Sequence, residues 1–148
     1  MAKQTPIEML LELAQGRVDE ATKRLGALLT SEHACEVKLD MLIQYRKEYR
    51  ERFMQAARDG IGPDAWRNYS VFIGKLDDAI VQQQQIVDNS KQLTSQGQKQ
   101  WVSERNRMKA FDTLSARKLA ADHRRLNKDE QRQNDEHAAK QHREKGES

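Results

Sequence analysis

The feature that most constrains this chain is a seven-residue repeat of apolar side chains that runs from Leu11 to Ala56 without a break. Two positions of each repeat, a and d, are apolar except at Glu32 and Arg46. A strict heptad over this length predicts one strand of a left-handed coiled coil. The a and d positions are Leu11, Ala14, Val18, Ala21, Leu25, Leu28, Glu32, Cys35, Leu39, Leu42, Arg46, Tyr49, Phe53 and Ala56.

A stop signal followed at once by a start signal interrupts this pattern at Gly60. Gly60 suits the left-handed residue that closes a helix, and Ile61 suits the apolar contact that follows such a cap. Gly62 can serve as the N-cap of a second helix, with Pro63 at its first position and Asp64 near the positive end of its dipole. These signals predict a helix over about 5–59, a turn over 60–63 and a second helix from about 64.

A second heptad strand follows the turn. If the chain folds back on itself, the a and d residues of the two strands face each other along a seam and pair around Ile61. Several of these pairs place a large side chain opposite a small one. Phe53 pairs with Tyr69, and the pairs of one large and one small side chain are Leu25 with Gly97, Ala21 with Trp101 and Ala14 with Met108. We therefore expect an all-α fold, a long two-helix antiparallel coiled-coil hairpin over residues 1–121. The second seam contains Trp66, Tyr69, Ile73, Leu76, Ile80, Gln83, Val87, Ser90, Thr94, Gly97, Trp101, Glu104, Met108 and Phe111.

The second strand is least apolar between Gln82 and Gln100, where polar residues and a glycine occupy seam positions. We expect loose packing there, with a local shift of frame that brings Ile86 and Leu93 into the seam.

The composition fits a thin seam and not a thick core. Hydrophobic residues make up 36% and charged residues 33% of the 148 residues, against about 45–50% and about 25% in typical globular domains. After Ala121, Leu126 is the one large apolar residue. We expect 122–148 to be a polar, charged C-terminal extension that is a frayed helix or disordered on its own.

Nothing in the sequence indicates catalysis, a cofactor or a metal. A two-stranded coiled coil offers no water-excluding pocket, and His137 and His142 are five residues apart, so they do not share a helical face. The net charge is +3, from 26 basic and 23 acidic residues that alternate along the chain, which disfavours nucleic acid as a partner. A single cysteine, no signal-peptide h-region and no membrane-spanning stretch predict a cytoplasmic protein.

One edge of the predicted hairpin is more apolar than its own seam requires. The g positions near the turn include Tyr45, Phe72, Ala79 and Ile86, beside the d residues Leu42, Tyr49 and Leu76. Two interpretations are open: a widened core contact, or a docking surface for another protein.

The segment from about 41 to 84 resembles the FliJ family of flagellar export proteins, a soluble component of the flagellar type III export apparatus. The resemblance is carried by Met41 to Arg50 (MLIQYRKEYR), Gly60-Ile61, Trp66 to Tyr69, Phe72-Ile73, Leu76 and Ala79-Ile80. It extends outward to Leu13-Ala14 and to Leu114, and it leaves the tail unmatched.

The resemblance implies a non-enzymatic factor that binds the flagellar export ATPase hexamer, the cytoplasmic part of the transmembrane export gate and substrate chaperones. It implies a location peripheral to the inner face of the cell membrane at the flagellar base, through protein partners only. The implied gate-binding positions are Lys38, Leu42, Tyr45, Tyr49, Phe72, Leu76, Ala79 and Gln83, of which Lys38 and Gln83 depart from the residues typical of the family. The positions expected to bind the ATPase, chosen from their place near both termini, are Ile7, Leu10, Leu11, Val18, Arg105, Met108 and Phe111.

We therefore expect a coupling and chaperone-like factor of flagellar type III protein export. The alternative is a generic coiled-coil adaptor or stalk protein of another type III secretion system.

Overall fold

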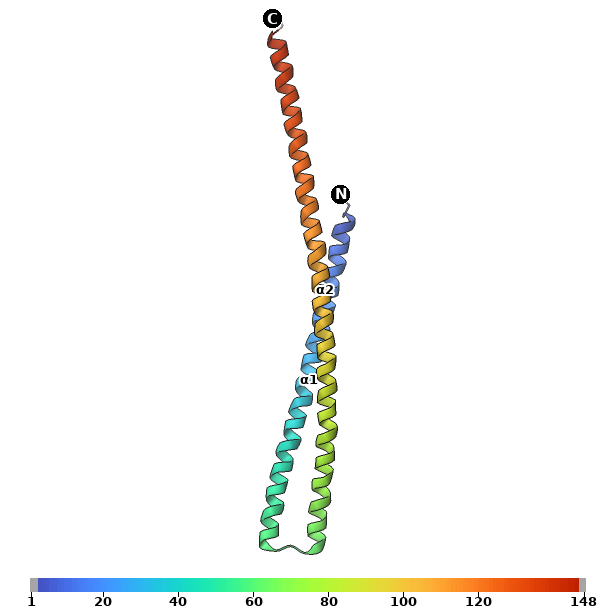
Figure 1. Cartoon of the computed structure of the whole chain (residues 1–148), viewed down its shortest axis with the longest axis vertical. Coiled ribbons are helices and arrows are strands. Elements are labelled where there is room, and N and C mark those ends of the chain that lie inside the picture. Colours follow the sequence, from blue (N-terminus) through green and yellow to red (C-terminus); the bar gives the residue numbers. More distant parts are fainter. Residues whose placement is uncertain (1–2, 147–148) are drawn as a thin grey trace. The chain divides into compact units, whose positions relative to one another are not determined.

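The computed structural model describes residues 3–146 and consists of two helices, α1 (Pro6–Asp59) and α2 (Pro63–Gly146). Within this range only 3–5 and 60–62 lie outside the helices, and no strand is present. Figure 1 shows the two helices joined by one short turn. The all-α helical hairpin predicted from the heptad pattern is confirmed.

The chain divides into two compact units. The turn unit comprises Asp19–Ser103 and contains the connection between the helices. The terminal unit comprises Met1–Val18 and Glu104–Ser148, so that it brings together the first residues of α1 and the second half of α2. No helix in the described range is long and apolar enough to cross a membrane.

Helix α1 begins with a capping box formed by Thr5 and Glu8. The hydroxyl of Thr5 accepts a hydrogen bond from the backbone N–H of Glu8 at 3.2 Å, and the Glu8 carboxylate accepts one from the backbone N–H of Thr5 at 3.1 Å. Pro6 occupies the first helical position, where its missing N–H costs nothing. Three signals therefore start the helix at this point.

The turn follows the predicted stop and start. Gly60 has a φ of 90°, and its N–H bonds to the carbonyl of Ala57 at 3.3 Å, as in a left-handed helix cap. The carbonyl of Gly62 accepts the first helical bond of α2, from the N–H of Trp66 at 3.0 Å, so Gly62 is the N-cap. Asp64 lies in the first turn of α2, where the helix dipole favours an acidic residue.

The predicted seam is the core of the turn unit. Leu39 and Leu76 are buried, and Val87 is only 2% exposed. The predicted register is confirmed by the pair Phe53 and Tyr69, whose rings lie 5.3 Å apart. Each of the other seam positions of this unit is also buried or half-buried, except Trp66.

Trp66 departs from the prediction because it is 52% exposed. It lies in the first turn of α2, beside the connection, where there is less of the opposite helix to cover it. Its ring still contacts that of Phe53, with centroids 4.9 Å apart.

The polar stretch of α2 keeps the original frame, so the expected shift of frame is wrong. Ile86 and Leu93 are 47% and 54% exposed, while Gln83 and Thr94 are buried in the seam. The amide of Gln83 donates to the carbonyl of Cys35 at 3.0 Å, and the hydroxyl of Thr94 donates to the carbonyl of Ser90 at 3.0 Å. These bonds satisfy the buried polar groups, so no rearrangement is needed.

Within the terminal unit, the seam continues through Ala14, which is 3% exposed. The predicted partner residues Met108 and Phe111 are half-buried. Helix α2 then continues to Gly146, and every described residue from His123 onward is exposed. That this extension is frayed or disordered on its own stays a prediction, and its last two residues lie outside the described range.

Candidate partner-binding surfaces

Six aromatic side chains gather beside the turn and form one connected cluster. Tyr49 is central, with its ring centroid 4.4 Å from that of Phe72 and 5.3 Å from that of Tyr69. The rings of Tyr45 and Phe72 form a T-shaped pair with their centroids 6.2 Å apart. Helix α1 contributes Tyr45, Tyr49 and Phe53, and α2 contributes Trp66, Tyr69 and Phe72. The cluster therefore depends on the register of the two helices.

The aromatic cluster is not sealed inside the protein. Tyr45 is 44% exposed, while Tyr49 and Phe72 are half-buried. Each of these rings thus contacts a neighbouring ring and keeps part of its surface open to solvent. A rigid, partly exposed aromatic surface is the kind of group that anchors protein–protein interfaces.

The eight positions expected to bind the export gate fall into two sets. Lys38 and Tyr45 are exposed, and the half-buried set beside them is Leu42, Tyr49, Phe72 and Ala79. We call these six residues the aromatic stripe. Leu76 and Gln83 instead lie in the seam, 7% and 4% exposed. Because they occupy d positions, their side chains face α1. They therefore pack between the helices and expose little surface that a partner could contact.

Two exposed apolar residues next to the aromatic stripe were not predicted. Val37 is 42% and Met41 is 67% exposed. Together with Lys38, Leu42 and Tyr45 they line an open hollow on the surface of α1. Both occupy outward heptad positions, where a polar residue is usual, and that mismatch is the signal that could have revealed them.

The terminal unit carries a second apolar surface. Of the seven residues expected to bind the ATPase, Leu10 is 43% exposed, Arg105 is exposed, and the others are half-buried: Ile7, Leu11, Val18, Met108 and Phe111. Leu10 and Phe111 line a small hollow between the two helices of this unit.

Three further residues line the hollow of the terminal unit and were not predicted. They are Leu13, which is 63% exposed, and the basic residues Arg17 and Arg107. Leu13 at an outward position of the heptad was again the available signal. In the described chain, no group of three or more His, Cys, Asp or Glu side chains could hold a metal ion.

Comparison with known proteins decides the family. The family model described as "Flagellar FliJ protein" matches residues 3–147. The chain belongs to the FliJ family. It is 33% identical to the Flagellar FliJ protein of Salmonella typhi over 138 residues, which cover 93% of this chain and 94% of the relative. It is 31% identical to the Flagellar FliJ protein of Escherichia coli K12 over the same shares of the two chains.

Membership of the FliJ family gives the chain a role in flagellar protein export and flagellum biogenesis. The FliJ family is a component of export and not a known enzyme family. The match also reaches beyond the segment on which the resemblance rests, because it includes nearly all of the charged C-terminal extension.

Proposed function

We propose that this chain is a non-enzymatic coupling and chaperone-like factor of flagellar type III export, which binds the export ATPase ring and the transmembrane export gate. The observation that carries the proposal is the aromatic stripe: preordered rings with open faces, in a member of a flagellar export family. Each unit has its own apolar surface, which supports two separate binding sites.

The aromatic stripe is the proposed gate-binding surface. Tyr45 and Phe72 would bury their open faces against the partner, and Met41 would extend the contact along α1. The rings already touch one another, so binding costs little side-chain entropy. Leu76 and Gln83 hold α1 and α2 in the register that brings the rings together.

The terminal unit is the proposed ATPase-binding surface. Leu10, Leu13 and Phe111 supply apolar contacts, and Arg17 and Arg107 supply positive charge beside them. The exposed extension from His123 to Gly146 would lie against the same partner. Substrate chaperones are further proposed partners, and the proposed location is the inner face of the cell membrane at the flagellar base, reached through these proteins.

The test measures binding of the purified chain to the isolated cytoplasmic part of the export gate and, separately, to the export ATPase. Phe72→Ala removes the ring of α2 that contacts both Tyr45 and Tyr49. We expect it to weaken gate binding by roughly tenfold to a hundredfold, as for an interface hot spot, and to leave ATPase binding unchanged. The matched control is Val71→Ala, because Val71 is the neighbouring residue, 53% exposed, and outside the aromatic cluster.

Equal affinity of Phe72→Ala and wild type for the gate would reject the stripe as its binding surface. Wild-type protein that binds neither partner would reject the two-partner function. A helical circular dichroism spectrum and a melting temperature close to wild type establish that Phe72→Ala retains its fold. The variant Leu10→Ser tests the other surface. We expect it to lose ATPase binding and to keep gate binding.

A further inference from the structure

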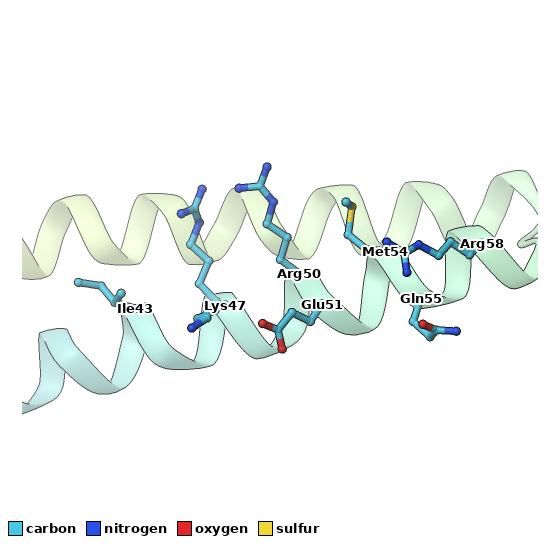
Figure 2. A pocket seen from close by; sticks show the side chains of 8 residues that line it. Ile43, Lys47, Arg50, Glu51, Met54, Gln55 and Arg58 are labelled. Carbon is cyan, nitrogen blue, oxygen red and sulfur yellow. The ribbon is translucent and has the colours of Figure 1, made fainter.

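The edge of the turn unit opposite the aromatic stripe carries a second surface. It is an open hollow lined by one side of α1, and Figure 2 shows side chains that line it, among them Ile43, Arg50, Met54 and Arg58. We call the following six residues the basic hollow: Ile43, Arg46, Lys47, Arg50, Met54 and Arg58. Ile43 and Arg50 occupy e positions of the heptad, whereas Tyr45 of the stripe occupies a g position, which places them on different edges.

The basic hollow has more positive charge than the protein itself neutralises. Its lining includes four basic side chains and one carboxylate, that of Glu51. Arg46 is engaged, because its guanidinium forms an ion pair with Asp77 of α2. Lys47, Arg50 and Arg58 are exposed and form no ion pair within the described part of the chain. Three cations therefore remain available to an outside group.

The basic hollow also has an apolar component. Ile43 is 47% and Met54 is 52% exposed, and they lie about three helical turns apart on α1, with Lys47 and Arg50 between them. Exposed apolar side chains framed by cations along one helix match a ligand with the inverse pattern. That ligand has apolar side chains along a stripe and carboxylates beside it.

We propose that the basic hollow is a docking site for an acidic amphipathic helix of a partner protein. The helix would lie along α1, place apolar side chains on Ile43 and Met54, and place carboxylates near Lys47, Arg50 and Arg58. Such a helix would pack on α1 as a third helix, in the geometry by which helices pack in bundles. A membrane surface is a poorer match, because Ile43 and Met54 are the only two apolar side chains among the lining residues, whereas a helix that lies on a membrane buries a continuous apolar face.

The proposal is tested with a synthetic probe and the full chain. The probe is a fluorescein-labelled three-heptad peptide with leucine at a and d and glutamate at the flanking positions, and its control is a scrambled peptide of identical composition. Fluorescence anisotropy measures the affinity of each. We expect the amphipathic peptide to bind at least about tenfold more tightly than the scrambled one, with affinity that falls as salt is raised.

Variants of the hollow then locate the site. The double variant Lys47→Glu with Arg50→Glu should lower the affinity for the amphipathic peptide by at least about tenfold, because it places carboxylates opposite the carboxylates of the peptide. The matched control is Lys75→Glu with Lys99→Glu, which makes the same charge change at two exposed lysines of the turn unit outside the hollow. Met54→Ser should lower the affinity for the peptide and change its salt dependence little, since it removes an apolar contact and no charge.

Three results would overturn the proposal. The first is equal binding of the two peptides, and the second is an affinity that the double variant in the hollow leaves unchanged. The third is binding to phosphatidylserine-containing vesicles that depends on Lys47 and Arg50 when the peptide does not bind. The proposal stands apart from the gate-binding surface, because Phe72→Ala should leave peptide binding intact and the double variant should leave gate binding intact.

Discussion

Gln83 shows, at the scale of a single residue, how a polar side chain is kept inside an apolar seam. Its side chain is 4% exposed, and its amide donates a hydrogen bond to the carbonyl of Cys35 on the opposite helix. Sliding one helix along the other would leave that amide buried without an acceptor, at a cost of about 1–3 kcal/mol. Gln83 therefore favours the observed register of the two helices over the adjacent registers, as a lone polar residue does in other coiled coils.

Replacing Gln83 by leucine should stabilise the hairpin and weaken the preference for this register. A leucine of similar volume removes a polar group from the seam, and the Cys35 carbonyl remains within α1, where helical bonding satisfies it. We expect a gain of about 1 kcal/mol, seen as a melting temperature higher by about 2–4 °C. Gln82→Leu at the exposed neighbouring position is the control. A lower melting temperature for Gln83→Leu would contradict this account.

Gly97 and Gly74 should respond differently to the same substitution. A Cβ atom at Gly97 would lie 2.6 Å from Cδ1 of Leu28 and 3.8 Å from Cδ1 of Leu25, whereas one at Gly74 would meet nothing within 4 Å. Alanine at Gly74 should therefore stabilise α2 by about 1 kcal/mol through helix propensity. At Gly97 the clash, which costs about 1–3 kcal/mol, should cancel or reverse that gain. Urea titration of both variants measures the difference, and equal gains would show that Leu28 moves aside freely.

Seam residues could be predicted from the sequence with few errors, but their surroundings could not. The heptad places a side chain on the inner face whatever its chemistry, and so Gln83 and Thr94 were assigned to the seam correctly. The expected exchange with Ile86 and Leu93 was wrong because hydrogen bonds to backbone carbonyls of the helices satisfy the buried polar groups. Heptad position alone does not reveal such partners.

At the scale of the elements, the ends of the helices are defined by different signals. The turn at Gly60 was predicted because glycine and proline act within a few residues of each other. The capping box at Thr5 and Glu8 was not predicted, although Thr-Pro-Ile-Glu has the usual spacing for one. Both ends depend on bonds to backbone groups that a helix terminus leaves unpaired.

Substitution of Gly60 should destabilise the turn unit. With a φ of 90°, an alanine at this position is strained by about 1–2 kcal/mol. Asparagine, which tolerates the left-handed region better, should cost less. Chemical denaturation of Gly60→Ala and Gly60→Asn measures both effects. Equal stability of the alanine variant and wild type would mean that the connection adopts another conformation at no cost.

At the scale of the whole molecule, the sequence was enough to predict which parts of the helices pair, but it predicted the exposed apolar surfaces only in part. The aromatic stripe was predicted from heptad edges, but Leu76 and Gln83, which the sequence placed both in the seam and on the expected gate-binding surface, are almost fully buried, and the exposed residues Met41 and Leu13 were overlooked. Exposure depends on how far a neighbouring side chain reaches over a residue, which spacing alone does not specify. The basic hollow escaped for the same reason, since its residues occupy several heptad positions on α1.

Removal of residues 123–148 should leave the stability of the hairpin unchanged. Every described residue of this segment is exposed, so no seam contact is lost. We expect the truncated protein to keep the wild-type melting temperature and to lose helical circular dichroism signal in proportion to the residues removed. A clear fall in melting temperature would show that the extension packs against the rest of the chain.

The position of the aromatic cluster next to the connection has a consequence for the order of assembly. Contacts such as Phe53 with Tyr69 close only a short loop, whereas contacts such as Leu28 with Thr94 close a much longer one, and short closures lose less chain entropy. We therefore expect the rings to meet first, and pairing to spread from them toward the two ends of the chain. During synthesis α1 is complete before its partner strand emerges, and the first part of that strand brings the rings that start the pairing.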